Sequence, residues 1–392
     1  MRCFIIILIG ALFIGSITRV DALADDAVAS LNQALAELPA NSPVFEIAEG
    51  TYHIASTWTI SRAHITVRGA GIGKTILLRE PGFTGHLISM NGEDSMITAL
   101  TIDGNGRGLS DKMGAELLLH KPRQVAQGIE VKNFAHIGIA VFPSECRVTQ
   151  CRITGLGDDT NTAGIWHDAG PTSTDSTIMI DHNTVTGSGI YGTGGIITIT
   201  NNQLSGNHCT SRGGGGQMDI GNAFTTNTVA TITGNTILNG GNIKACGIEM
   251  GGGTFTVTNN TIRNHGSSGI GSGHNAIKAT ITGNTISNSG RNTAEKNKPQ
   301  CRSAIYILYG AGNVEISGNR CFDDQPNKTQ TWGIILAPPP TQPDPRFLAR
   351  SSEHIVVKDN DLRGNLHAEG LLDESMAHDR TVSGNLPEQA NR

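Results

Sequence analysis

Two acidic residues, Asp219 and Glu249, occupy equivalent places in a pattern that recurs along the chain. Each directly follows an aliphatic residue or methionine, which itself follows a small or polar residue. The residues at this place, in chain order, are Trp166, Tyr191, Asp219, Glu249, Gly271, Tyr306 and Ile335. Because side chains alternate along a strand, an inward-pointing aliphatic residue turns its successor outward. The pattern therefore predicts one exposed column in which aromatic residues flank two acids.

Such a column could transfer protons to and from a bound sugar. If Asp219 and Glu249 lie on adjacent strands, their side chains are roughly 5 Å apart. Two carboxylates at this distance disfavour double ionisation, so one pKa should be raised and that acid could donate a proton. The rings of Trp166, Tyr191 and Tyr306 could serve as platforms for sugar rings. The alternative is that all these residues are ordinary solvated positions on a sheet face.

Two reactions fit these residues. Hydrolysis needs an acid and a second carboxylate, and Asp219 with Glu249 fits the narrow separation of about 5 Å. Elimination on a uronan needs a base and a group that neutralises the substrate carboxylate, commonly Ca²⁺ held by carboxylate oxygens. Asp168, Asp219 and Glu249 could hold such a cation. The candidates for the base or for a substrate clamp are His167, Arg212, Lys244 and His274.

The elements that must position these residues form an internal repeat of six residues: an aliphatic, Thr, a turn residue, Asn, any residue and an aliphatic. Its copies lie at 199–204, 232–237, 257–262 and 281–286, with looser copies at 180–185, 316–321, 357–362 and, truncated, 382–385. Asn235, Asn260 and Asn284 are separated by 25 and 24 residues. Units of this length, with β-branched residues around a short turn, predict stacked coils of strand, bend and strand. At the bend, each Asn could adopt the left-handed conformation and bond the Asn of the next coil.

From about residue 27 to residue 385, the chain resembles the pectate-lyase-like superfamily of right-handed parallel β-helix proteins. The repeat carries the resemblance, together with the segments 45–54 and 65–71, which are similar to the way those domains begin. It implies an all-β, single-stranded, right-handed parallel β-helix. Proteins of this kind include lyases, hydrolases, epimerases and non-catalytic binders. We expect a protein that acts on a polysaccharide, with an acidic glycan favoured, or a carbohydrate-binding or structural surface protein.

The known active-site motifs of these proteins match only in part. Asp181 and His182 fit part of a pectate-lyase pattern, but Met179 stands where Trp is expected. The segment 164–168 is similar to the Asp-Pro-His motif of uronate epimerases without its Asp-Pro, and 157–159 is similar to the acid pair of polygalacturonases without the motifs that follow it. The motifs therefore do not select one reaction.

The composition agrees with a solenoid. The 392 residues include 50 glycines, and only 16% are charged and 4% aromatic, which indicates many turns and few large core side chains. A net charge of −5 provides no basic stripe, so we expect no nucleic-acid partner. The sequence indicates no oligomeric state.

The first 24 residues have the features of a secretory signal. A basic residue precedes an apolar run at 4–17, and small residues precede Asp25. We expect cleavage, secretion to the periplasm or outside the cell, and no membrane span in the mature chain; the alternative is an uncleaved anchor. The predicted organisation is a signal peptide at 1–24, an N-terminal capping helix at 25–43, the β-helix at 44–365 and a C-terminal cap or tail at 366–392.

Export changes the interpretation of the cysteines. Without Cys3, six remain, and an oxidising compartment favours the pairs Cys146–Cys151, Cys301–Cys321 and Cys209–Cys246. Buried unpaired thiols are the alternative, and the spacing does not favour zinc.

Residues 25–38 carry the one apolar stripe typical of a helix, which we expect to cover the first coil. Residues 107–127 are expected to form a projecting loop or short helix, and 291–302 and 337–350 to be insertions.

Overall fold

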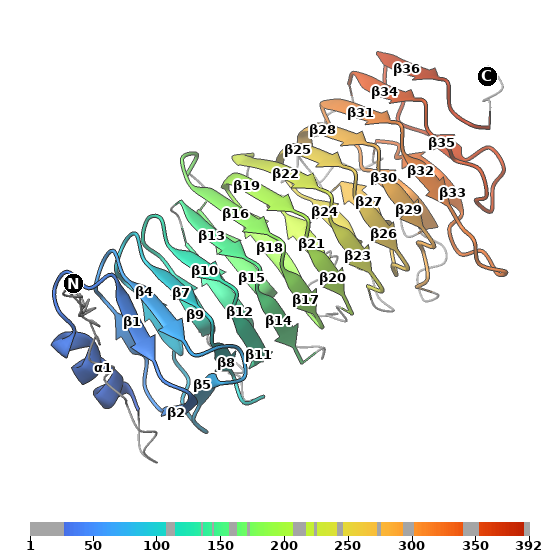
Figure 1. Cartoon of the computed structure of the whole chain (residues 1–392). Coiled ribbons are helices and arrows are strands. Elements are labelled where there is room, and N and C mark those ends of the chain that lie inside the picture. The colour runs from blue at the N-terminus through green and yellow to red at the C-terminus, as the bar shows by residue number, and fades with distance from the viewer. Residues whose placement is uncertain are drawn as a thin grey trace, which may run out of the picture.

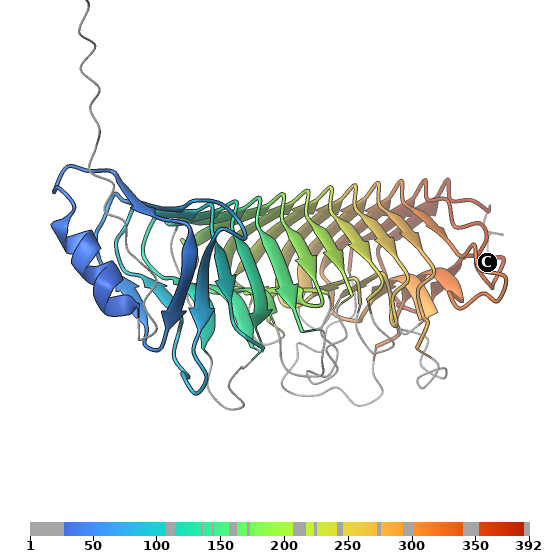
Figure 2. The same cartoon turned by 60° about the horizontal axis from the view of Figure 1, so that its bottom comes forward.

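Short strands rich in Ile, Val and Thr build nearly all of the regular structure. The computed structural model describes residues 27–106, 114–134, 136–142, 145–156, 163–170, 173–206, 217–222, 226–240, 246–272, 276–292, 302–339 and 353–387. In these ranges, successive turns of the chain place strands in three parallel sheets, as the strand order of Figure 1 shows. The coils stack along one axis from the N-terminal to the C-terminal end (Figure 2). The protein is therefore a parallel β-helix.

The three sheets are named A, B and C in the order in which the chain enters them. Sheet A contains β1 (Val44–Ile47), β4 (Thr66–Gly69), β7 (Met96–Thr98), β10 (Val125–Gln127), β13 (Cys146–Thr149), β16 (Thr177–Asp181), β19 (Gly195–Thr200), β22 (Thr228–Thr233), β25 (Gly253–Thr258), β28 (Ala276–Thr282), β31 (Asn313–Ser317), β34 (Ile355–Lys358) and β36 (Arg380–Ser383). Sheet B contains β2 (Gly50–Ile54), β5 (Thr75–Arg79), β8 (Thr101–Asp103), β11 (Glu130–Phe134), β14 (Arg152–Gly155), β17 (Thr184–Thr186), β20 (Gln203–Ser205), β23 (Thr236–Leu238), β26 (Thr261–Arg263), β29 (Thr285–Ser287) and β32 (Arg320–Phe322). Sheet C contains β3 (Trp58–Ile60), β6 (Ile88–Met90), β9 (Ala115–Leu119), β12 (Ile137–Val141), β15 (Ala163–Asp168), β18 (Gly189–Thr193), β21 (Met218–Ile220), β24 (Ile248–Met250), β27 (Ile270–Ser272), β30 (Ser303–Ile307), β33 (Trp332–Leu336) and β35 (Leu371–Asp373).

The core is a set of aliphatic columns inside the three sheets. In sheet A, the strand register pairs Ile199 with Ile232, Ile232 with Val257, and Val257 with Ile281. All four side chains are fully buried. Equivalent residues of successive coils thus stack directly on one another, so the interior is filled by small aliphatic side chains, as the composition predicts.

An asparagine ladder joins the coils at the bend between sheets A and B. The Nδ2 atoms of Asn235 and Asn260 each donate to the Asn Oδ1 of the next coil at 3.0 Å, and the same bond repeats along the stack. The ladder members are Asn183, Asn202, Asn235, Asn260, Asn284, Asn319, Asn360 and Asn385. At the earlier bend between β7 and β8, Leu100 is buried in this place, so the ladder begins later than the coils, as expected.

The left-handed residue of each bend differs from the prediction. None of the eight ladder asparagines, all of which are described, has a positive φ. The residue before each one does, for example Asn259 at 55° and Gly283 at 67°. Asn and Gly tolerate this conformation best, which explains why they recur there. The ladder Asn instead turns inward, where its amide bonds neighbouring coils.

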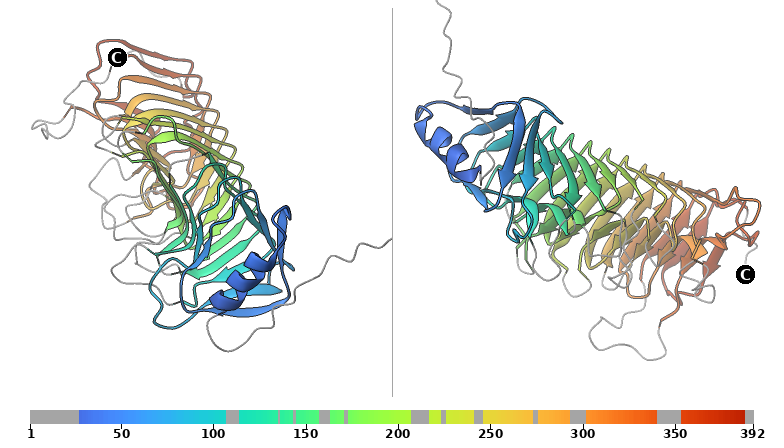
Figure 3. Two further views of the ribbon diagram at one scale, coloured as in Figure 1. Left: turned by 90° about the vertical axis from the view of Figure 1, so that its left-hand side faces the viewer. Right: turned by 90° about the horizontal axis from the view of Figure 1, so that it is seen from below.

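The N-terminal helix is present. It is α1 (Val28–Glu37), which buries Val28, Leu31 and Ala34. Figure 3 shows α1 across the N-terminal end of the stack, where it covers the first coil. Among the described residues, no helix has the length and apolar character needed to cross a membrane.

Two segments differ from the sequence prediction. Within 107–127, which was expected to project, the described part supplies β9 to sheet C and β10 to sheet A, so that prediction is wrong there. The run of buried residues in β9 continues the coils without the asparagine phrase. Beyond residue 366, β35 and β36 extend sheets C and A, so the coils continue into the tail.

The predicted disulfides are not formed where the structure describes their sulfurs. Cys151 is a buried free thiol, so its pairing with Cys146 is wrong. Cys321 is also a buried free thiol in the apolar interior, so the pair with Cys301 is wrong as well. Burial raises the pKa of the Cys151 thiol to about 11. The third expected pair includes Cys209, which lies outside the described residues.

Candidate active site on sheet C

The outward column predicted from the sequence is present on sheet C. The register pairs Trp166 with Tyr191, Tyr191 with Asp219, and Asp219 with Glu249. It continues from Glu249 through Gly271 and Tyr306 to Ile335. Seven residues that are far apart in the sequence therefore follow one another on consecutive coils, and the prediction of their alignment is confirmed. The prediction that the whole column is exposed is wrong at its C-terminal end, where Gly271 and Ile335 are buried.

Alternation along two short strands turns the acids outward. Met218 and Ile220 on either side of Asp219 are fully buried, and so are Ile248 and Met250 on either side of Glu249. With their neighbours fixed inside, both acids must point to the outer face of the sheet. Directly paired on adjacent parallel strands, they lie about 4.8 Å apart at the backbone.

The electrostatics of the pair favour a protonated Glu249. Its Oε2 atom is buried and has no hydrogen-bond partner among the described residues. Burial, followed by the negative charge of Asp219, raises the pKa of Glu249 well above its usual value. One acid of the pair was expected to behave in this way, and the structure identifies it as Glu249. The site can therefore present a proton donor beside a second carboxyl group.

Aromatic rings lie on both sides of the acids. Trp166 and Tyr191, on the two coils before Asp219, have ring centroids 6.3 Å apart and an interplanar angle of 39°. On the other side, Gly271 leaves the column without a side chain. A Cβ atom at Gly271 would come within 2.8 Å of the Cys246 Sγ, which disfavours any larger residue. Tyr306 then follows on the next coil.

The apolar end of this face was not predicted from the sequence. Trp166 and Tyr191 pack against a cluster separate from the main core: Ala115, Leu118, Ile137, Ala140 and Ala163. Through the register, Leu118 and Ala140 continue the column beyond Trp166. The signal in the sequence was the apolar run of β9, whose alternate residues could have been assigned to two faces.

His167 does not join the acids. It follows Trp166 in β15, so it points inward and is buried, with its Nδ1 atom 3.2 Å from the Val141 carbonyl oxygen. Burial lowers its pKa. The expectation that His167 is an exposed base or clamp conflicts with this position, because the alternation that exposes Trp166 hides its successor.

Asp168 also lies apart from the pair. It is paired with Thr193, two positions beyond Tyr191, and its Oδ1 accepts a hydrogen bond from the Gly170 amide at 2.8 Å. Among the described residues, Asp168, Asp219 and Glu249 do not form a group with ligating atoms close enough to share an ion. The expected three-carboxylate Ca²⁺ site is therefore not supported. Arg212, Lys244 and His274 lie outside the described residues.

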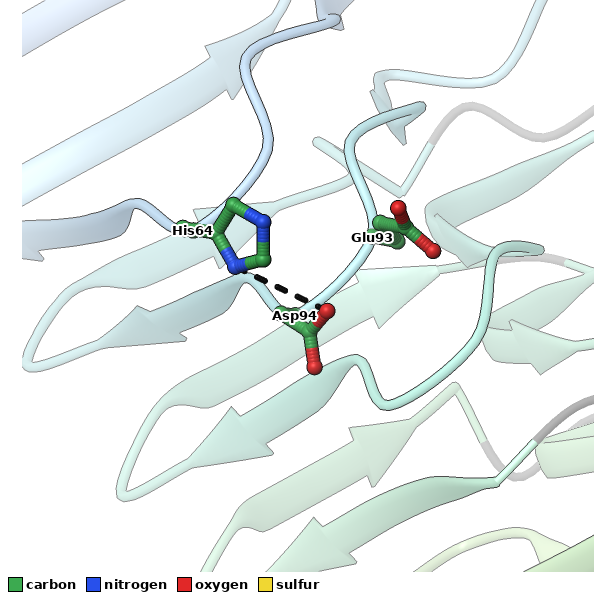
Figure 4. A group of neighbouring side chains, drawn as sticks. All are labelled: His64, Glu93 and Asp94. Carbon is green, nitrogen blue, oxygen red and sulfur yellow. Dashed lines mark ion pairs between the residues drawn. The ribbon is translucent and has the colours of Figure 1, made fainter.

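Another group of side chains could ligate a cation. His64, Glu93 and Asp94 approach one another at two bends next to sheet A (Figure 4). However, Arg123 binds both acids, with its Nε 2.5 Å from Asp94 Oδ1 and its Nη2 3.0 Å from Glu93 Oε2. The guanidinium neutralises the carboxylates, so we assign this cluster to the stabilisation of the bends.

Similar folds occur in several solved structures. The alginate lyase AlyF-OU02, solved with G6, is 16% identical, with a TM-score of 0.70 over 95% of this chain and 85% of that one. The A-module of mannuronan C-5 epimerase AlgE4 from Azotobacter vinelandii is 14% identical, with a TM-score of 0.60 over 93% and 98% of the two chains. The catalytic unit of a GH87 α-1,3-glucanase from Streptomyces thermodiastaticus is 16% identical, with a TM-score of 0.62 over 93% and 66%.

These likenesses bear on the fold. No protein-family model and no curated protein sequence matches the chain. At such low identity, the structural matches establish the fold alone. They confirm the expected fold, a right-handed parallel β-helix.

Proposed function

We propose that this protein is an enzyme that acts on a polysaccharide along the outer face of sheet C, with Asp219 and Glu249 as its reacting pair. The observation that carries the proposal is the direct pairing of these acids on adjacent coils, together with the buried, unpartnered Oε2 of Glu249. Support also comes from structural neighbours named as an alginate lyase, a mannuronan epimerase and an α-1,3-glucanase.

Hydrolysis is the reaction that this pair supports best. Glu249, protonated because of its raised pKa, donates its proton to the glycosidic oxygen as the bond to the anomeric carbon breaks. The Asp219 carboxylate, at the narrow separation, bonds to that carbon. Water then displaces Asp219, and the Glu249 carboxylate takes up the proton of this water. Trp166, Tyr191 and Tyr306 serve as platforms for the sugar rings on either side of the broken bond.

Elimination is the second candidate reaction, favoured by the similarity to the alginate lyase fold. It requires a base and a cation beside the substrate carboxylate. Arg212, Lys244 and His274 remain the candidates for these roles. An acidic glycan is the expected substrate in that case.

The test is a degradation assay on alginate, other uronans, α-1,3-glucan and neutral glycans, with and without Ca²⁺. We expect chain shortening that falls about 100-fold or more in Asp219→Asn and in Glu249→Gln. Glu46→Gln, an exposed acid on sheet A, is the matched control and should keep full activity. Absorbance of an unsaturated product distinguishes elimination from hydrolysis.

Two outcomes would contradict the proposal. If the wild type and both acid variants release the same products, the pair is not the reacting pair. If the wild type binds a glycan saturably but shortens none, the protein is a carbohydrate-binding protein, and Trp166 and Tyr191 are its binding residues.

Secretion is part of the same proposal. The signal-like segment at 1–24 and a polysaccharide substrate both suit a location outside the cytoplasm. We expect the mature chain to begin at about residue 25, followed by the capping helix and the β-helix. Amino-terminal sequencing of the exported protein checks the cleavage site.

A further inference from the structure

The column on sheet C changes its character beyond Glu249. The next place along it is Gly271, which has no side chain and is buried. The sulfur of Cys246 covers this place, because a Cβ atom at Gly271 would lie only 2.8 Å from the Cys246 Sγ. Tyr306 follows Gly271 on the next coil. A gap with a thiol as its floor therefore separates Glu249 from Tyr306.

The thiol of Cys246 differs from the other thiols that the structure describes. Cys246 is half-buried, whereas Cys146, Cys151 and Cys321 are buried. Burial raises the pKa of the Cys151 thiol to about 11, and it also raises the pKa of the Cys321 thiol. Alkylating reagents react with the thiolate and need access to it. Cys246 can therefore report chemically on what occupies the gap.

The order of the two acids along the axis gives a bound glycan chain a direction. This direction rests on the proposed hydrolysis, in which Asp219 bonds the anomeric carbon on the side opposite the departing oxygen and Glu249 protonates that oxygen. Asp219 is paired with Tyr191, and Glu249 is paired with Gly271. The sugar that keeps the anomeric carbon therefore lies toward Tyr191 and Trp166, and the sugar that leaves lies over Gly271.

We propose that the gap at Gly271 is the subsite for the first sugar of the leaving group, with Cys246 as its floor and Tyr306 as the platform for the sugar that follows. The non-reducing end of the chain points toward β15, and the reducing end points toward β30. A thiol behaves as a small apolar group, which suits the face of a sugar ring. Because platforms lie on both sides of the broken bond, the enzyme cuts within a chain.

Alkylation of Cys246 in the full chain tests the subsite. Iodoacetamide transfers its carboxamidomethyl group to the Cys246 thiolate and releases iodide, and peptide mass spectrometry identifies the modified cysteine. We expect this group to slow cleavage by about 10-fold or more, because it fills the subsite. In Cys246→Ser, the reagent should leave that variant's own cleavage rate unchanged. Each glycan of the degradation panel is also added before the reagent, and a bound glycan should protect Cys246 from alkylation.

Oligosaccharides labelled at the reducing end test the direction of the chain. Tyr306→Ala weakens binding on the leaving side, so the cut should move toward the label and the labelled product should become shorter. Trp166→Ala weakens binding on the other side, so the labelled product should become longer. The opposite shifts in both variants would show that the chain runs the other way.

The subsite and the proposed hydrolysis can fail separately. If Cys246 resists alkylation without glycan, or if its complete alkylation leaves cleavage unchanged, the subsite assignment is wrong although the enzyme is active. If the wild type shortens no glycan but a glycan protects Cys246, the gap binds sugar and the proposed hydrolysis is wrong. If no glycan is shortened and none protects Cys246, both are wrong.

Discussion

Glu249 is costly to ionise in the folded protein, because its Oε2 is buried without a partner and Asp219 lies on the next coil. In the unfolded chain, water solvates both acids. The folded state therefore raises the pKa of Glu249 and holds its proton more tightly than the unfolded state does. The contribution of this proton to folding stability is fully present below the pKa that Glu249 has in the unfolded chain. It is lost as the pH rises through the pKa that Glu249 has in the folded protein. Proton donation by Glu249 should be lost over the same pH range.

We therefore predict that Glu249→Gln stabilises the protein at alkaline pH. Glutamine keeps the neutral shape, so its stability should not fall as the pH rises through the folded pKa of Glu249. Thermal unfolding at a series of pH values measures this difference. It should vanish at acidic pH, where the glutamate is protonated in both states. A constant difference at all pH values would show that folding does not raise the pKa of Glu249.

The alternation of side chains along a strand determined how well the direction of a single side chain could be predicted. It placed Asp219 and Glu249 in one column, since buried neighbours mark both strands. The same alternation turns His167, the residue after Trp166 in β15, toward the interior, although His167 was predicted to be an exposed site residue. Which of the two acids holds the proton could not be predicted, because the burial of Glu249 Oε2 depends on packing between coils.

At each bend of the asparagine ladder, two adjacent residues have different roles. The first supplies the left-handed backbone, and the second supplies the ladder amide. Asn260 donates to Asn284 and to the Ile232 carbonyl, and it accepts from Asn235. Its neighbour Asn259 has φ 55°, a place taken by glycine in the coils on either side. The two asparagines look alike in the sequence but should differ in their tolerance of substitution.

We predict that Asn260→Ala destabilises the protein by about 3 kcal/mol or more, because several buried groups lose their partners together. Asn259→Gly should change the free energy of unfolding by no more than about 1 kcal/mol, since glycine adopts the same conformation. Denaturant unfolding of the two variants checks both values. Equal losses would mean that the side-chain ladder contributes little to stability.

Elements that lack the repeat phrase were the ones that the sequence did not reveal. In β9, the buried Glu116 pairs with Arg79, 37 residues earlier, with 2.8 Å between Arg79 Nη2 and Glu116 Oε2. A charged residue inside a short apolar run indicates a loop when its partner is unknown. The coil therefore had to be seen in three dimensions before the strand could be recognised.

A stack of coils has two ends, and each end is an open sheet edge that could pair with another chain. At the N-terminal end, α1 lies across the first coil and packs Leu31 into the main core, where this side chain is 0% exposed. The helix could be predicted from its apolar stripe, and its place at the end follows from the need to cover that edge. The cap should therefore govern how the whole molecule associates.

We predict that Leu31→Asp exposes the first coil and drives self-association. A charge in this buried place should cost at least about 3 kcal/mol and loosen α1 from the first coil. Light scattering and size-exclusion chromatography should then detect larger species that grow with concentration. Asn32→Asp adds the same charge on the exposed side of the helix and should leave the protein unchanged. If Leu31→Asp lowers the melting temperature without any association, the edge is protected by something other than α1, and capping is not the function of the helix.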